Sequence, residues 1–241
     1  MKKTVIILTI LILLGSLSVN LLAEKPRLGV LRFTNTVAGT SFWRWNNKVA
    51  TELQDMLISE LFSTKAFQVL ERKEIGAVFS EQDLSASGRV SKRTLVKMRR
   101  IKGAKYLIAG TVSAFEKTSS TGGKIRFKGI SLGGKKTKAY IAVDVKVIDS
   151  ETGEIVDART IEAKAKGKAI GAGLSLRNFS IGGADAKKTP VGKAIRACIV
   201  YISEYLKCSL GKVKYPRCMK RWDRMEAKRR KKTKDSIDLD L

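Results

Sequence analysis

The sequence contains no histidine and only three cysteines: Cys198, Cys208 and Cys218. The cysteine spacing matches no metal-binding pattern, and without histidine the usual set of zinc ligands is incomplete. A phosphate-binding glycine loop and the Gly-x-Ser-x-Gly elbow of hydrolases are also missing. We therefore expect no metal site and no cofactor.

Carboxylates are scarce, with 22 Asp and Glu against 48 Lys and Arg, which gives a formal charge of +26. Those that cluster lie on or beside a predicted hairpin, where turn residues and solvent-facing positions are their ordinary explanation. They are Asp144, Asp149, Glu151, Glu154 and Asp157. Because these are poor candidates for acid–base catalysis, we predict that the chain is not an enzyme.

The N-terminus has the pattern of a secretory signal peptide, predicted over residues 1–23. Lys2 and Lys3 precede an uncharged stretch with a short apolar centre at residues 5–14, and Ala23 ends a passable cleavage site. A retained membrane anchor is the alternative, since about 20 uncharged residues just span a bilayer. No cysteine stands where a lipoprotein signal requires one, so we expect no N-terminal lipid.

The positive charge is concentrated in a predicted basic tail, residues 212–241, in which Asp223 and Glu226 are the only acids between Lys212 and Lys234. An exported protein of this charge meets anionic envelope surfaces before it meets nucleic acid. Two structures of the tail stay open, a helix on an anionic surface and a disordered extension. In an oxidising compartment Cys208 and Cys218 could close a small loop and leave Cys198 buried in a helix.

Hydrophobic periodicity predicts strands at residues 28–33, 67–72 and 105–118, and a hairpin of strands at 139–149 and 155–167 with Gly153 in its turn. Helical spacing begins at Asn46 and continues to residue 61, and a second helix is predicted near residues 73–81. Ser91 is predicted to cap a third helix over 91–103, and Thr189 with Pro190 to start a closing helix. This order predicts an α/β (α+β) fold, a mixed sheet flanked by helices.

Two glycine-rich passages, "KIRFKGISLGG" and "GAGLSLRNFSIGG", flank the predicted hairpin. Their apolar residues alternate with period two, which indicates strands, and the phase slip at Gly129 indicates a bulge or a tight turn. The alternating residues are Ile125, Phe127, Ile130 and Leu132 in the first passage, and Leu174, Leu176, Phe179 and Ile181 in the second. They fit either membrane-inserted hairpins or hairpins folded on the protein's own surface, and each run is shorter than the 9 to 11 residues that a crossing strand needs.

An aromatic cluster, Phe42, Trp43 and Trp45, lies in the loop before the first predicted helix. Such side chains could stack on a ligand or narrow a passage. Their ordinary role at a helix start is to pack on the core.

Four motifs in register resemble the curli-secretion channel (CsgG/HfaB-like) family: "VLERKEIGAVFSEQDLSASG", "GAKYLIAGTVSAFE", "IAVDVKVIDSETGEIV" and "TPVGKAIRACIVYI". The resemblance covers nearly all of residues 28–206. It implies a periplasmic α/β domain, here residues 24–211, that assembles into a ring. It also implies that residues 118–138 and 166–188 form membrane hairpins, and that the loop 34–47 with Phe42, Trp43 and Trp45 constricts a pore. The chain departs from the family in lacking a lipid-attached cysteine and in carrying the basic tail.

Two functions follow as hypotheses. The first is a homo-oligomeric component of a secretion or envelope-assembly system, in the periplasm or associated with the outer membrane, with a secreted or envelope protein as partner. The second is a soluble periplasmic adaptor of the same fold that binds an envelope enzyme or an anionic polymer without forming a pore. Nucleic acid is not an expected partner.

Overall fold

The computed structural model describes residues 24–37, 45–98, 100–121, 125–127, 130–132, 135–169, 189–211 and 216–236. The predicted signal peptide lies outside these residues. The strands are β1 (Arg27–Val30), β2 (Thr34–Asn35), β3 (Gln68–Leu70), β4 (Tyr106–Thr121), β5 (Ile125–Phe127), β6 (Ile130–Leu132), β7 (Lys135–Asp149) and β8 (Ile155–Ala169). The helices are α2 (Asn47–Ser63), α3 (Ile75–Ala86), α4 (Pro190–Leu210) and α5 (Pro216–Asp235).

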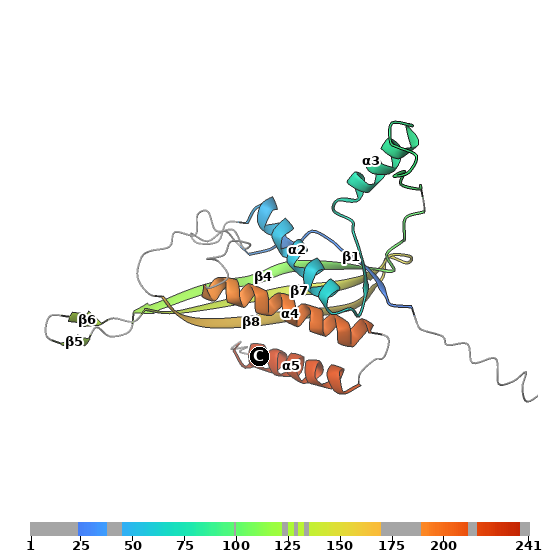
Figure 1. The fold of residues 1–241 in the computed structure, drawn as a ribbon. Coiled ribbons are helices and arrows are strands. Elements are labelled where there is room, and N and C mark those ends of the chain that lie inside the picture. The colour runs from blue at the N-terminus through green and yellow to red at the C-terminus, as the bar shows by residue number, and fades with distance from the viewer. Residues whose placement is uncertain are drawn as a thin grey trace, which may run out of the picture.

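Six strands form one open, mixed sheet in the order β3-β1-β4-β7-β8, with β2 also paired to β4 (Figure 1). β1 runs parallel to β3 and β4, whereas β7 runs antiparallel to both of its neighbours, β4 and β8. With the four helices that flank the sheet, this arrangement confirms the predicted α+β class. The turn between β7 and β8 has Gly153 at φ +74, as its place in the predicted hairpin requires.

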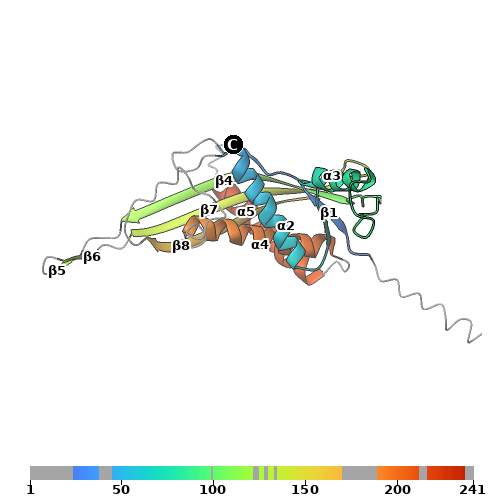
Figure 2. The ribbon, with the colours of Figure 1, turned by 45° about the horizontal axis from the view of Figure 1, so that its top comes forward.

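One hydrophobic core lies between the sheet and helices α2 and α4, which cross in front of the strands in Figure 2. Alternate residues of β7 face this core and are at most 1% exposed: Ile141, Val143, Val145 and Val147. The apolar face of α4 covers them with Ile195, Ile199, Ile202 and Leu206. The two periodicities read from the sequence therefore meet at this interface.

The two core helices begin where their capping residues predict. The Asn46 side chain accepts a hydrogen bond from the Val49 backbone N–H at 2.9 Å, and the Thr189 hydroxyl accepts one from the Gly192 N–H at 3.0 Å. Each bond satisfies a backbone donor that the first helical turn leaves without a partner. Pro190 occupies the first turn of α4, where its missing N–H costs nothing.

The predicted helix over residues 91–103 is wrong. Apart from residue 99, which is not described, the structure has a single turn at 92–94 and no helix in this segment. Its apolar side chains are exposed, Met98 to 64%, so they find no surface against which a helical face could pack. A helix of this length is marginal in water without tertiary contacts, and here the cap signal at Ser91 alone was misleading.

The three antiparallel strands are longer than predicted. β4 and β7 stay paired as far as Thr121 and Lys135, and β7 and β8 as far as Lys135 and Ala169. At about 3.4 Å per residue, a strand of 16 residues such as β4 is roughly 50 Å long. The sheet thus continues into both regions that were predicted as hairpin extensions.

Candidate functional site

The first glycine-rich passage contains a short antiparallel pair of strands, β5 and β6. Ile125 is the register partner of Leu132, and Phe127 that of Ile130. This antiparallel pairing forms a hairpin, one of the two predicted interpretations, and Gly129 itself lies outside the described residues. Figure 1 shows the pair beyond the ends of β4 and β7, away from the core. Whether it enters a membrane stays a prediction.

The second passage and most of the aromatic loop lie outside the described residues. This applies to Leu174, Leu176, Phe179 and Ile181, and to Phe42 and Trp43. Trp45 is described, and it is half-buried and packed against the hydrophobic core beside the start of α2. This position is the ordinary one for an aromatic residue before a helix, and the role of the loop in a pore stays a prediction.

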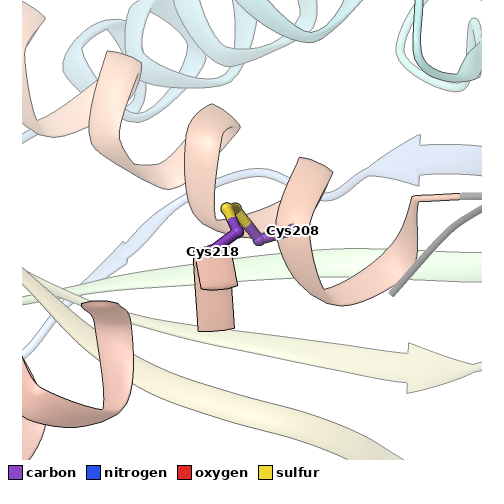
Figure 3. The surroundings of a disulfide bond; sticks show 2 residues. All are labelled: Cys208 and Cys218. Atoms are coloured by element: carbon purple, nitrogen blue, oxygen red, sulfur yellow. A yellow bond between two sulfur atoms is a disulfide. The ribbon is translucent and has the colours of Figure 1, made fainter. Parts of the chain in front are cut away.

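A disulfide bond joins Cys208, near the end of α4, to Cys218, in the first turn of α5 (Figure 3). The Cα atoms of the two residues are 5.8 Å apart. Cys198 is a buried free cysteine in α4, and burial raises the pKa of its thiol to about 12. The covalent bond therefore holds the start of the basic tail against the domain.

Trp222 anchors the basic helix α5 to the domain. Its side chain is 4% exposed and contacts the rings of Tyr205 and Tyr201 edge to face, at centroid distances of 5.5 and 6.5 Å. One residue further on, Asp223 accepts a hydrogen bond from Arg159 of β8 at 2.9 Å. Of the two tail structures predicted, the structure has the helix, and it packs on α4.

Beyond this anchor α5 is strongly basic, with Glu226 as an internal counter-charge. Its carboxylate accepts hydrogen bonds from Arg229 at 2.7 Å and from Arg230 at 2.8 Å, and these guanidinium groups lower its pKa to about 2. The lysines Lys228, Lys231, Lys232 and Lys234 share this part of the helix, and it ends at Asp235. α5 therefore presents a positively charged surface on a helix that is held against α4.

The clustered carboxylates on and beside the β7–β8 hairpin have structural partners. Asp149 lies 3.1 Å from the Lys105 ammonium and accepts a hydrogen bond from the Glu151 N–H, and these two interactions lower its pKa. Asp144 accepts from the Thr160 hydroxyl at 2.6 Å. The Tyr205 hydroxyl donates to Asp157 at 2.5 Å. These contacts show that the carboxylates stabilise the hairpin and its packing against α4.

An apolar surface that sequence reasoning did not single out lies on α3 and the segment after it. We call it the α3 surface, and its large exposed side chains are Val78, Phe79, Leu84, Leu95, Val96 and Met98. The Val96 N–H donates to the Ser85 hydroxyl at 3.2 Å, which brings the two parts of the surface together. In Figure 1 α3 stands away from the sheet. The apolar residues of 91–103 could have signalled this surface, but the cap signal at Ser91 predicted a helix there instead.

The described residues contain no group of three or more acidic or cysteine side chains placed to hold a metal ion. Within the same ranges, every helix is too short or too polar to cross a membrane.

The fold and these surfaces describe an α+β domain with a long antiparallel sheet and a basic C-terminal helix. The model of the family described as "Curli production assembly/transport component CsgG" matches residues 14–237 of the chain. The chain therefore belongs to the CsgG family, as the sequence motifs indicated. The match includes α5, which the motifs had left outside the family.

Solved structures show only distant likeness to the chain. A hypothetical protein from Chlamydia trachomatis is 11% identical with a TM-score of 0.43, over 76% of this chain and 98% of that one. A PelC dodecamer from Paraburkholderia phytofirmans is 9% identical with a TM-score of 0.36, over 79% and 89%. No curated protein matches the sequence. At this level of likeness the dodecamer is a property of PelC alone.

Proposed function

We propose that the chain is a homo-oligomeric, envelope-associated component of a secretion or assembly system, working in the periplasm or at the outer membrane. Membership of the CsgG family, over residues 14–237, is the observation that carries this proposal. The division into a signal peptide at 1–23, a domain at 24–211 and a basic tail at 212–241 is part of it.

The long strands β4, β7 and β8 support a role in assembly with other subunits. They continue past the core toward both glycine-rich passages, at 118–138 and 166–188. Strand pairs that extend from a folded domain can join equivalent pairs of other subunits, because an open edge offers unpaired N–H and C=O groups. We propose that these passages are the arms that enter or line the membrane assembly.

The α3 surface supports contact between subunits. Exposed apolar side chains gathered on one protruding element are a mark of a protein interface. Covering a large apolar side chain contributes about 1.5 to 3 kcal/mol. We propose that a second copy of the chain covers this surface in the oligomer.

Fractionation of the tagged protein, followed by gel analysis without heating, tests the proposal. We expect heat-sensitive oligomers in the outer-membrane fraction and ion conductance when they are added to planar bilayers. Phe79→Glu on the α3 surface should reduce the oligomer to monomer. Phe62→Glu is the matched control, since Phe62 is 60% exposed on α2 and lies under Lys65.

A monomer released by osmotic shock, with no conductance, would overturn this proposal. It would favour the second candidate, a soluble periplasmic adaptor. The positive surface of α5, held by Trp222 and the disulfide, is the observation that favours this candidate.

A further inference from the structure

A groove of about 840 Å³ lies between α5 and the strands β4, β7 and β8. We call it the α5 groove. Its volume is within the range of small-molecule binding sites. Six of its lining residues are cations: Lys138, Lys164, Lys166, Lys228, Arg229 and Lys232. The acids that line it are Glu116 and Glu162. The groove thus carries an excess of positive charge, which comes from the β7–β8 hairpin and from α5.

The strands place two of these cations directly opposite each other. Lys138 of β7 is the register partner of Lys166 of β8, and Thr118 of β4 is the partner of Lys138 on the other side. Like charges at directly opposed positions of an antiparallel pair destabilise it. A sheet that keeps this pair gains stability when an anion lies between the two ammonium groups.

The helix adds a second like-charge pair to the same groove. Lys228 and Lys232 are four residues apart, so their side chains lie on one face of α5, and this spacing is also unfavourable for equal charges. Thr233 of α5 and Ser236, the residue after the helix, also line the groove, and their hydroxyls donate to the backbone carbonyls of Arg229 and Thr233. The inner face of this part of α5 is therefore basic, where a packed helix normally presents apolar residues.

Only some of the cations in the groove have an acidic or aromatic partner. Arg229 is bound by Glu226 at 2.7 Å, and the Lys164 ammonium lies 5.1 Å from the centre of the Tyr140 ring. Among the salt bridges of the described residues, none involves the lysines that remain: Lys138, Lys166, Lys228 and Lys232. Four ammonium groups thus share one groove without an acidic partner at salt-bridge distance.

We infer that the α5 groove binds a ligand that carries at least two phosphate groups. Four ammonium groups, with three N–H donors each, and the Thr118 hydroxyl offer more donors than the two oxygens of one carboxylate accept. A phosphate offers three strong acceptor oxygens and close to two charges, so two phosphates match the groove in both respects. The ligand is a soluble polyphosphorylated molecule or a diphosphorylated lipid headgroup. This inference goes beyond the proposed function, because it requires neither a ring nor a membrane hairpin.

Calorimetric titration of the full chain at low salt tests the inference, with pyrophosphate as the soluble probe. Flotation with phosphatidylcholine vesicles, with and without cardiolipin, tests the lipid source. The groove variant combines Lys138→Gln, Lys166→Gln and Lys232→Gln. The matched control combines Lys146→Gln, Lys231→Gln and Lys234→Gln, which removes the same charge from exposed positions on β7 and α5 outside the groove.

Whichever probe binds the unmodified chain, pyrophosphate or cardiolipin vesicles, the groove variant should bind it at least about tenfold more weakly. The affinity of the control variant should stay within about twofold of that of the unmodified chain. Binding should weaken as salt screens the lysines. Pyrophosphate binding identifies a soluble ligand, and binding to cardiolipin vesicles alone identifies a headgroup. Equal losses in both variants, or no binding of either probe, would overturn the inference.

Thermal unfolding without any anion gives a second readout. Because the groove variant relieves like-charge repulsion, its Tm should equal or exceed that of the unmodified chain. Pyrophosphate should raise the Tm of the unmodified chain and the control, but not that of the groove variant. If the groove variant fails to fold, the expectation that its Tm is unchanged or raised is wrong. The single variant Lys138→Gln then tests binding, and unchanged pyrophosphate binding by it would overturn the inference.

Discussion

The two C-terminal helices differ sharply in what holds them. α4 and α5 have nearly equal lengths, 21 and 20 residues, both begin with a proline, and a disulfide joins them. α4 buries one whole face in the core, whereas Trp222 is the only buried side chain among residues 217–235 of α5. Core packing therefore maintains α4, whereas a few local contacts hold α5 against the domain.

Truncation of a core residue in α4 should have the largest effect. Ile202 is fully buried, so Ile202→Ala should lower the free energy of unfolding by about 2 to 5 kcal/mol through lost transfer energy and a residual cavity. Met225→Ala in α5, where the side chain is 43% exposed, should change it by less than about 0.5 kcal/mol. Urea unfolding measures both, and similar losses would erase the contrast between the helices.

Removal of the aromatic anchor should release the part of α5 beyond the disulfide. Trp222→Ala should cost about 3 kcal/mol, at the low end for a buried tryptophan, because α5 can detach while the core stays intact. Limited proteolysis should then cleave within residues 216–236 much faster than in the unmodified chain. Trp222→Phe keeps a ring beside Tyr205 and serves as the control. Unchanged cleavage of Trp222→Ala would show that other contacts anchor the helix.

Loss of the disulfide should have a slightly smaller effect. The cysteines are 10 residues apart, and closing a loop of this size stabilises a fold by about 2 to 3 kcal/mol through the unfolded state. The combined change Cys208→Ser and Cys218→Ser should therefore lower the free energy of unfolding by that amount, and so should reduction of the unmodified chain. Thiol titration should find one thiol, Cys198, which reacts only after unfolding because it is buried and its pKa is raised. Three thiols in the oxidised protein would contradict the pairing.

The smallest effect concerns the local ion pairs of α5 and depends on pH. The pKa of Glu226 is about 2 in the folded chain, below its ordinary value of 4.5, so its ionised form favours folding at neutral pH. That contribution is fully present above pH 4.5 and is lost as the pH falls toward 2. Because Arg230 is largely exposed, we expect Glu226→Gln to cost only about 0.5 to 1 kcal/mol at pH 7. Unfolding curves of the two proteins should converge near pH 2, and a constant difference would exclude this ion-pair origin.

Much of the fold could be predicted because its elements carry strong local signals. The alternation from Ile141 to Val147 and the cap at Thr189 with Pro190 specify a strand and a helix start without reference to the rest of the chain. The segment 91–103 also has a cap signal, at Ser91, and forms no helix in its described part. Within the described residues its large apolar side chains stay exposed, and a local cap signal does not reveal whether a surface exists to cover them.

The candidate surfaces were harder to predict than the elements. The α5 groove combines Lys138, Lys166 and Lys232, whose positions in the sequence give no sign that they meet. Their proximity depends on the register of β7 with β8 and on where α5 packs, and both are set by the whole fold.

The fold class and the family of this protein followed from its sequence alone. Its α+β order, its family and the excess of lysine and arginine can all be read from linear patterns, because periodicity, capping and charge are local properties. Only the tertiary structure decided that the basic tail is a helix packed on α4, and that its lysines face those of the sheet across one groove. Charges at distant positions become a shared field only when folding brings them together, because electrostatic interaction depends on distance in space and not on separation along the chain.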